Sequence, residues 1–452
     1  KRIGTSADGL SARSNNQVGA EYAGIRVKGT SNTVRASDIT IHSNQLAGNN
    51  KTLSTTSTTG GSHAIYVDTT NTLTVTGNLI GLTPDGLGAL NNIGNGVYTS
   101  NTTTVTIGGI TADKRNIIAG NADAIKTGFG TQNLTILGNY IGTDITGLKA
   151  IANESNGIFL SDTANAKIGD GTAAGRNIIA NNKLNGIRNS KTPNTEIKGN
   201  YIGTDKNGAS AFGNSEHGIY VQNSAGVVIG GSNSADGNVI ANGKRIGILA
   251  VDAASNVLIE NNIIGLAADG TTIAANTQSG IETKDTNGIT IRNNTLSGNG
   301  ASGIHLVSSP SSSIINNRIG TDTSGNLDKG NKGTGIDVQT ASTNLTINGN
   351  VISGNDSHGI QFTDGDASGT LVYDNRIGTT QNGSTALANN GAGILVNKTP
   401  NLTIGSTSSA GNTISGNGQS GINLFNDQTN LLSKNITIVG NNIGISKDAT
   451  TA

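Results

Sequence analysis

The sequence lacks cysteine, methionine and tryptophan entirely, and it contains only four prolines among 452 residues. Without cysteine, the protein has no disulfide bonds and no thiolate ligands for a metal ion. Charged residues make up only 13% of the chain, and their positive and negative charges balance. A balanced charge provides no basic field for phosphates, so the composition argues against a nucleic-acid-binding protein. No run of 18 apolar residues occurs either, which argues against insertion into a membrane.

Aromatic residues are also scarce, at 3% of the chain, whereas glycine occurs 66 times. Each glycine inside a helix costs about 1 kcal/mol relative to alanine, so a chain interrupted by glycine every few residues cannot form long helices. The hydrophobic content of 33% suffices for a thin core. The hydrophilic surface must then consist mainly of asparagine, serine and threonine rather than of charged residues.

The chain is a repeat array. The phrase Asn-Tyr-Ile-Gly-Thr-Asp at residues 139–144 returns at residues 200–205. A related phrase, such as Asn-Ile-Ile-Ala at residues 116–119, divides each repeat into two sub-units. Because an array grows by adding units to one continuous core, we interpret residues 1–452 as a single domain. The double repeats are expected to start near residues 1, 78, 139, 200, 262, 317, 375 and 441.

Within each sub-unit, the apolar residues fall in three short alternating runs bounded by glycine or asparagine. Residues 134–136, 139–141 and 157–160 are examples. Each run is too short for a helix and has the two-residue period of a strand. Three strands per turn, with turns of roughly 23 residues plus insertions, predict an all-β fold. We expect a single parallel β-helix of about 14 complete turns, without disulfides.

These phrases resemble the right-handed parallel β-helix repeats of the pectate-lyase-like superfamily, particularly the Gly/Asn/Thr-rich arrays of secreted bacterial surface proteins. The resemblance rests on the Asn-x-Ile-Gly-Thr, Gly-Ile-x-Val and Thr-Ile phrases and spans residues 1 to about 446. It implies a right-handed solenoid and an extracellular or cell-surface location of the bacterial type. The phrases identify a scaffold and carry no activity by themselves.

Asparagine opens each turn, and turns that stack about 4.8 Å apart bring these side chains together. Stacked asparagines form amide ladders, in which every side chain bonds its neighbours above and below. We therefore predict a structural ladder. Its members are Asn78, Asn116, Asn139, Asn177, Asn200, Asn238, Asn262, Asn294, Asn317, Asn350, Asn375, Asn412 and Asn441.

The candidates for catalysis are Glu282, His305 and Asp337, which occupy the outward position of three consecutive Gly-Ile-x strands. In register, the two carboxylates would stand about 9.6 Å apart, with the histidine between them. That separation is near the upper limit for inverting glycoside hydrolysis. Three ionisable side chains on a solvent-facing sheet more often serve only to keep that face hydrated. Opposite charges on neighbouring strands also attract each other slightly, which accounts for their proximity without catalysis. The sequence therefore favours the absence of an active site.

Two further sets of residues are candidates for binding. Tyr66 and Tyr98 are neighbours on the outward column and offer a platform for a glycan, unless they are ordinary strand aromatics. Asp144, Asp205 and Asp322 share one loop position, where a calcium ion is possible. Calcium requires six to eight oxygens, however, and aspartate favours such loops by bonding to the backbone. We therefore expect no cofactor and keep calcium as the alternative.

Uniform repeats, zero net charge and few functional-looking side chains favour a non-enzymatic, extracellular structural or adhesive β-helix. Residues 2–5 and residues 441–444 are in phase with the same strand. This predicts end-to-end self-association into a fibre, or a stalk cut from a longer surface protein. The alternative is a polysaccharide-active enzyme, either a lyase or a hydrolase, or a glycan-binding module whose partners are surface glycans.

Overall fold

The structure is a computed structural model that describes residues 2–3, 5–6, 8, 10, 23–49, 62–408, 410–425 and 433–446. The chain divides into two compact units, Lys1–Asn238 and Val239–Ala452. Residue 1, where the first repeat was expected to start, lies outside the described residues. The interpretation of the whole chain as one domain stays a prediction.

Each unit contains a narrow sheet built from the Asn-x-Ile phrases, whose two-residue strands pair in parallel. In the first unit its strands are β1 (Arg2–Ile3), β4 (Gln45–Leu46), β6 (Leu79–Ile80), β8 (Ile117–Ile118), β11 (Tyr140–Ile141), β14 (Ile178–Ile179) and β17 (Tyr201–Ile202). In the second unit they are β20 (Val239–Ile240), β23 (Ile263–Ile264), β26 (Thr295–Leu296), β29 (Arg318–Ile319), β32 (Val351–Ile352), β35 (Arg376–Ile377), β38 (Thr413–Ile414) and β41 (Asn442–Ile443).

The other two strands of each turn form the broad face of each unit, again by parallel pairing. In the first unit they are β2 (Ala23–Lys28), β3 (Ile39–His42), β5 (His63–Thr76), β7 (Val97–Gly108), β9 (Ile125–Thr127), β10 (Leu134–Leu137), β12 (Ile158–Ser161), β13 (Lys167–Ile168), β15 (Ile187–Ser190), β16 (Glu196–Ile197), β18 (Ile219–Gln222) and β19 (Val228–Gly230). In the second unit they are β21 (Ile248–Val251), β22 (Leu258–Glu260), β24 (Ile281–Lys284), β25 (Thr290–Arg292), β27 (Ile304–Val307), β28 (Ser313–Ile315), β30 (Ile336–Gln339), β31 (Thr346–Asn348), β33 (Ile360–Thr363), β34 (Thr370–Tyr373), β36 (Ile394–Asn397), β37 (Leu402–Gly405), β39 (Ile422–Phe425) and β40 (Thr437–Val439).

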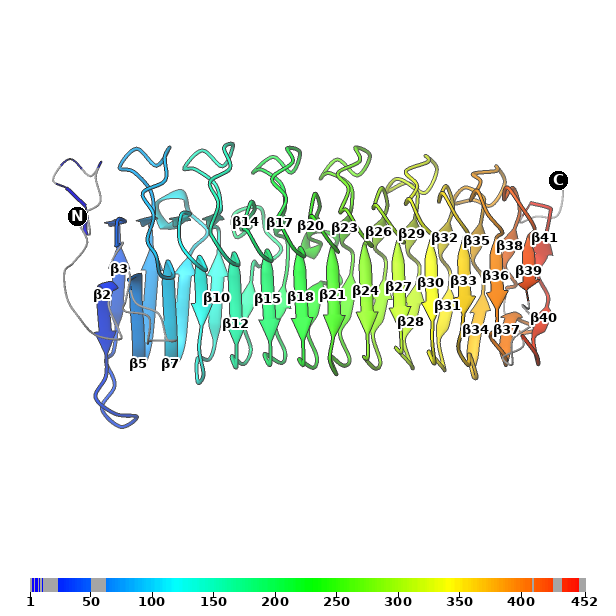
Figure 1. Ribbon diagram of the computed structural model, residues 1–452, viewed down its shortest axis with the longest axis horizontal. Helices are drawn as coiled ribbons and strands as arrows, with labels where there is room; N and C mark the ends of the chain where they lie inside the picture. The colour runs from blue at the N-terminus through cyan, green and yellow to red at the C-terminus, as the bar shows by residue number, and fades with distance from the viewer. Residues whose placement is uncertain are drawn as a thin grey trace. The chain divides into compact units, whose positions relative to one another are not determined.

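Among the described residues, helical structure is limited to two 3-10 turns, η1 (Ala112–Lys114) and η2 (Ser234–Asp236). The described part of the chain contains no helix that is long and apolar enough to cross a membrane. Figure 1 shows the parallel strands of each unit standing in rows, with loops beyond their ends. In β5 and β7 the second and third strands of the turn merge into one longer strand. The predicted all-β parallel β-helix is confirmed.

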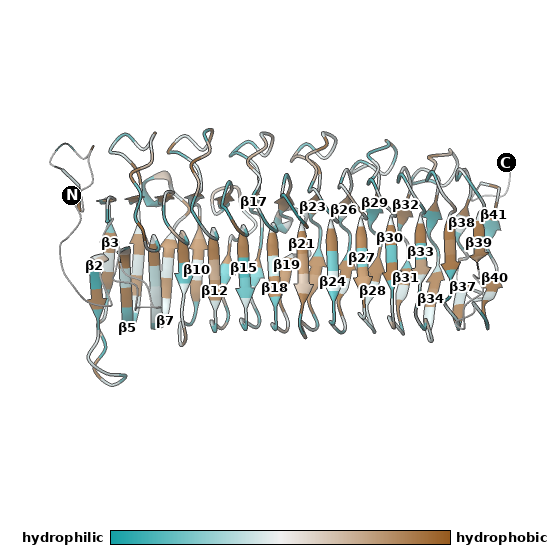
Figure 2. Ribbon diagram, viewed as in Figure 1, coloured by the Kyte–Doolittle hydropathy of each residue, from teal (hydrophilic) through white to brown (hydrophobic). Residues whose placement is uncertain are grey.

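The core of each unit consists of columns of isoleucine, valine and leucine that point inward from successive turns. Ile118, Ile141 and Ile179 pair in register on neighbouring strands and are fully buried. Figure 2 shows apolar residues concentrated in the strands. Burial of one such side chain contributes about 1.5–3 kcal/mol. The glycine that follows each phrase allows a corner, because Gly142 has a φ of +81° and a Cβ there would overlap the carbonyl oxygen of Ala180.

The asparagine at the start of each turn lies in a buried column. Each Nδ2 donates to the Oδ1 of the asparagine in the next turn, over 2.8 to 3.1 Å. The same Oδ1 also accepts the backbone N–H of the preceding asparagine, as between Asn177 and Asn200. In the first unit this column continues from Asn44 to Asn238, and in the second from Asn262 to Asn441.

A second amide column, which the sequence analysis missed, lies at the corner before the broad face. In the second unit, for example, Asn299 donates to Asn331, which donates to Asn355. Its signal in the sequence is an asparagine that follows the phrase asparagine by five residues in one sub-unit, as in Asn294 and Asn299, and by fourteen in the other, as in Asn317 and Asn331. The members are Asn49, Asn92, Asn121, Asn153, Asn182 and Asn214 in the first unit and Asn276, Asn299, Asn331, Asn355, Asn389 and Asn417 in the second.

Replacement of Asn200 by alanine is expected to lower the free energy of unfolding by about 3 kcal/mol, because each buried polar group left without a partner costs 1–3 kcal/mol. The groups affected are the side-chain amides of Asn177 and Asn238 and the carbonyl of Ile168. Urea unfolding measures the change. Asn207→Ala, at an exposed loop position, is the matched control and should leave the midpoint unchanged. Equal midpoints for both variants would contradict a stabilising ladder.

Candidate functional site

Strands β24, β27 and β30 bring the three catalytic candidates together on the broad face of the second unit. Glu282 pairs in register with His305, and His305 pairs with Asp337. Each residue follows the buried isoleucine that begins its strand, so the strand's two-residue period turns all three side chains outward. The flanking positions of the same column are Leu249 and Gln361, which are uncharged.

The imidazole of His305 lies between the two carboxylates. Its Nδ1 is 3.3 Å from Oε2 of Glu282, within hydrogen-bond distance, and its Nε2 is 3.8 Å from Oδ2 of Asp337. The side chains of Glu282, His305 and Asp337 are 24%, 21% and 15% exposed, so solvent and ligands reach them while burial still restricts their movement. Oδ2 of Asp337 also accepts a hydrogen bond from Nε2 of Gln339.

Two polar atoms of this group have no hydrogen-bond partner among the described residues, namely Nε2 of His305 and Oδ1 of Asp337. Buried polar atoms are nearly always hydrogen-bonded, so an exception calls for an explanation. The two atoms belong to neighbouring side chains that face each other. Both atoms are shielded from solvent, so the group contains a donor and an acceptor with unsatisfied hydrogen-bonding capacity.

Burial and charge shift the proton affinities of this group. Burial disfavours the imidazolium of His305, but the hydrogen bond that Nδ1 donates to Glu282 and the charge of Asp337 outweigh it and raise the pKa of His305 above its usual 6.5. Burial raises the pKa of Asp337 above its usual 3.8, against the opposing charge of His305. Between these two pKa values His305 is a proton donor and Asp337 an ionised acceptor. This is the pairing that general acid–base chemistry requires.

His358 lies at a corner next to this group and has a different role. Its Nδ1 accepts the backbone N–H of Ala392 over 2.9 Å, which places a neutral imidazole in the turn. Burial lowers the pKa of His358, although the charge of Asp337 opposes this. His358 therefore acts as a corner residue.

The structure brings Tyr66 and Tyr98 together in the first unit, but with their faces turned toward each other. Their ring centroids are 5.3 Å apart at an interplanar angle of 14°, and His63 stacks on both rings. Because the rings stack along the column, their edges point outward. Tyr66 is only 8% exposed. A sugar that packs flat on either ring needs a face that this stacking occupies, so the pair makes a poor sugar platform.

The loop aspartates Asp144, Asp205 and Asp322 lie in three separate loops and are nearly buried. Each carboxylate closes its own loop. Oδ1 of Asp205, for example, accepts the N–H groups of Ala209 and Ser210. Burial opposes ionisation of Asp205, but these hydrogen bonds outweigh it and lower its pKa. The described residues include no group of three or more His, Cys, Asp or Glu side chains arranged to hold a metal ion, and calcium at these loops stays a prediction.

The fold is thus a parallel β-helix that displays a pair of carboxylates and a histidine on an outward strand face. The sequence matches the family described as "Right handed beta helix region" over residues 136–319 and 225–445. These overlapping matches cover more than half of the chain, so the chain belongs to the right-handed β-helix family. A search of curated protein sequences finds no significant match.

Several solved structures are similar to the chain. The A-module of a mannuronan C-5 epimerase from Azotobacter vinelandii shares 17% identity and a TM-score of 0.42, over 68% of this chain and 86% of that one. A double mutant of a periplasmic alginate epimerase shares 14% identity and a TM-score of 0.39, over 83% and 77%. The Dettilon tailspike protein shares 16% identity and a TM-score of 0.34, over 84% and 63%. Values this low assign no substrate to this chain.

The expectation that the chain is not an enzyme is wrong. The solved structures similar to it include epimerases, so a uniform right-handed β-helix is no indication of a non-enzymatic protein. The physical reason is that the scaffold constrains only inward side chains, corners and glycines. The outward positions are free to vary, and a few of them suffice for a site.

The titration of His305 tests the electrostatics of this group. Nuclear magnetic resonance of the labelled histidine side chains should give His305 a pKa above 6.5, because two carboxylates flank it. Glu282→Gln removes one of these charges and should lower that pKa. His358, whose pKa is lowered, is the internal control. A His305 pKa at or below 6.5, or one that Glu282→Gln leaves unchanged, would contradict the described geometry.

Proposed function

We propose that the protein is a polysaccharide-active enzyme whose acid–base site consists of Glu282, His305 and Asp337. One observation carries the proposal. The imidazole of His305 lies between two carboxylates on the strands beside it, and Nε2 of His305 and Oδ1 of Asp337 lack hydrogen-bond partners among the described residues. A group that served only for solvation would be more exposed, and a group that served only for stability would have satisfied these atoms.

Each residue has a distinct role in the proposed site. Glu282 accepts a hydrogen bond from Nδ1 of His305 and so fixes the ring orientation, which makes it a positioning residue. This leaves Nε2 of His305 as the atom that exchanges a proton with the substrate. Asp337 is the second acid–base group, and its partly buried carboxylate has a raised pKa suited to taking up a proton.

The reaction class that fits is cleavage of a glycosidic bond. Nε2 of the protonated His305 donates its proton to the leaving oxygen as the carbon–oxygen bond breaks. Inverting hydrolysis needs its acid and base about 6.5–9.5 Å apart to admit a water, and the 3.8 Å between Nε2 of His305 and Oδ2 of Asp337 is too short for it. In elimination, Asp337 takes a carbon-bound proton of the sugar, whose electron pair forms the new double bond. Elimination needs one donor and one acceptor on the same side of the sugar, which this close pair supplies.

The location and partners follow from the same proposal. Long polysaccharides are encountered at or beyond the cell surface, which agrees with the extracellular location inferred from the sequence. Surface glycans are then substrates that the protein cleaves, rather than partners to which it only adheres. A glycan-binding module without turnover is the remaining alternative. End-to-end self-association stays a prediction.

Loss of either acid–base group should abolish turnover. Against a panel of acidic and neutral polysaccharides, the wild type should release reducing ends or unsaturated products from at least one. His305→Gln and Asp337→Asn should lower kcat by about 10²–10⁴-fold, the usual contribution of general acid–base catalysis. Asp356→Asn, at an exposed ion pair with Lys332 in the same unit, is the matched control.

Two outcomes would overturn the proposal. One is that no polysaccharide in the panel is cleaved by the wild type, in which case binding without cleavage would favour the module. The other is turnover by His305→Gln and Asp337→Asn at the rate of Asp356→Asn. Unfolding midpoints of all three variants establish that any lost activity does not reflect lost folding.

A further inference from the structure

The first unit carries different chemistry at the outward column of its broad face. Lys126 on β9 pairs in register with Phe159 on β12, which pairs with Arg188 on β15, which pairs with Tyr220 on β18. We call Lys126, Phe159, Arg188 and Tyr220 the cationic stripe. Cations and aromatic rings alternate along it, and its four positions include no acid. The preceding positions of the same column are Arg26, Tyr66 and Tyr98.

Aromatic rings hold the two cations of the stripe in place. Nζ of Lys126 is 5.0 Å from the ring centroid of Phe159, and Cζ of Arg188 is 4.8 Å from the same centroid. Arg188 also lies 5.6 Å from the ring of Tyr220. Such contacts stabilise a cation without neutralising its charge. The positive charges are therefore ordered before any ligand arrives, which lowers the entropy cost of binding.

Few acids compensate for these charges. One acid compensates part of the charge of Lys126, since Oδ2 of Asp123 lies 3.8 Å from its Nζ. Arg188 has no carboxylate within ion-pair distance in the part of the chain that the structure describes. Its Nη2 reaches Oε1 of Gln222 only at 3.5 Å, and its Nε has no hydrogen-bond partner there. The positive charge of this partly exposed side chain is therefore left without a carboxylate in the described structure, and arginine is suited to bidentate binding of anions such as carboxylates.

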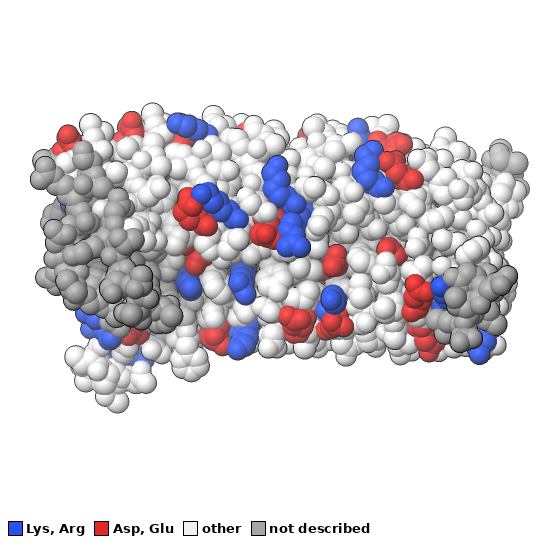
Figure 3. All heavy atoms as spheres, viewed as in Figure 1, with Lys and Arg blue, Asp and Glu red and all other residues white. Residues whose placement is uncertain are grey.

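The spacing of the stripe defines the shape of that ligand. Lys126 and Arg188 are two strand spacings apart, or about 9.6 Å along the column. Two ordered charges at this separation, with an aromatic ring between them, match a chain that repeats both its negative charges and its apolar ring edges. Figure 3 shows that charged side chains on the visible face form small mixed groups instead of one basic patch. A nucleic acid depends on many phosphate contacts for its affinity and is the poorer match.

We propose that the cationic stripe binds an anionic polysaccharide, with Lys126 and Arg188 holding successive carboxylates or sulfates of a chain that runs along the column. The proposal names the substrate class of the proposed enzyme and rests on that function in this respect. Binding is measured separately from turnover, so the two proposals fail separately.

The test is binding of the full chain to defined oligosaccharides by isothermal titration calorimetry at low and moderate salt. The ligands are an oligouronate, a sulfated oligosaccharide, a neutral oligosaccharide of equal length and a single-stranded DNA oligonucleotide. The wild type should bind at least one of the two anionic glycans at least tenfold more tightly than the neutral one. Added salt should weaken that binding, because it screens the charges. Comparison of the oligouronate with the sulfated oligosaccharide shows whether the site prefers carboxylates or sulfates.

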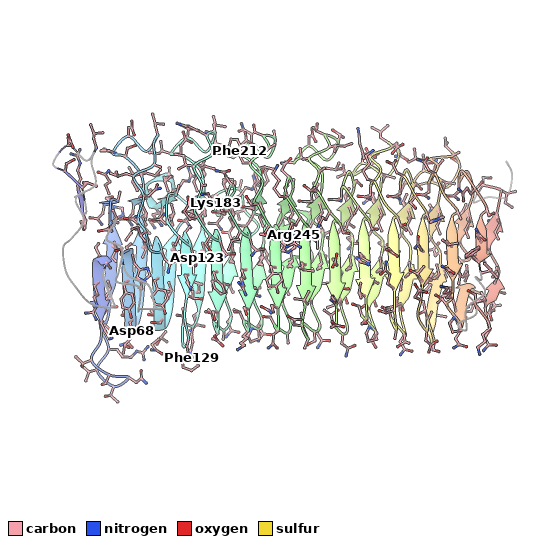
Figure 4. All side chains as sticks on the ribbon, viewed as in Figure 1. Asp68, Asp123, Phe129, Lys183, Phe212 and Arg245 are labelled. Carbon is pink, nitrogen blue, oxygen red and sulfur yellow. The ribbon has the colours of Figure 1, made fainter. Side chains whose placement is uncertain are left out.

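The variants locate the site. The double variant Lys126→Gln, Arg188→Gln should weaken binding of the anionic glycan at least tenfold, and Lys126→Arg with Arg188→Lys should retain most of it. Lys183→Gln is the control, because Lys183 is an exposed cation of the same unit that is paired with Glu154. Figure 4 labels Lys183 among the loops and Asp123 near the ends of the strands. His305→Gln should bind normally and fail only in turnover.

Several results would overturn the proposal: equal binding of neutral and anionic glycans, tighter binding of DNA, no binding at all, or unchanged binding by the double glutamine variant. If that variant binds normally while His305→Gln loses turnover, the proposal that the cationic stripe binds glycan is wrong and the proposed enzyme stands. If the cationic stripe binds anionic glycans but no glycan is cleaved, the binding proposal stands and the proposed enzyme is wrong.

Discussion

Parallel stacking of successive turns in exact register is the constraint on which the rest of this structure depends. Two columns of buried asparagine in each unit enforce it, because every side-chain amide bonds both the backbone and the side chain of the neighbouring turn. A shift of one residue would leave these groups unsatisfied in the interior, at 1–3 kcal/mol each. Isoleucine columns supply most of the burial energy and set the same register, because a one-residue shift would turn each inward side chain outward.

Because the register is fixed, residues at equivalent positions of successive repeats lie above one another in a column. Residues 23 and 32 positions apart, such as Glu282, His305 and Asp337, become neighbours because equivalent strand positions pair. Each turn therefore contributes one outward side chain to a given column at no cost to the core. The first unit fills its column with cations and aromatic rings, and the second places two carboxylates and a histidine there. One scaffold can thus carry two kinds of surface.

This regularity decides how much the sequence could predict. Glycine, asparagine and isoleucine recur at positions where stacking requires them, so the strands and the neighbourhood of the three candidate side chains followed from spacing. Side-chain direction within the column did not. The stacking of Tyr66 on Tyr98 depends on rotamers, and so does the approach of Arg188 to Phe159. The second amide column was missed because its asparagines follow the phrase asparagine at two alternating distances, five and fourteen residues, which hide its regularity. The non-enzymatic expectation failed because periodicity describes the scaffold and not its outward positions.

Residue-resolved hydrogen exchange of the corner amides tests the central claim most directly, because it measures whether the asparagine columns hold the turns in register. The backbone N–H groups of Asn294 and Asn317 donate to the Oδ1 atoms of Asn317 and Asn350. They should therefore exchange as slowly as the strand N–H of Ile281, which donates to Gly303. Exchange of the asparagine amides at the rate of an unprotected peptide, while Ile281 stays protected, would contradict the account.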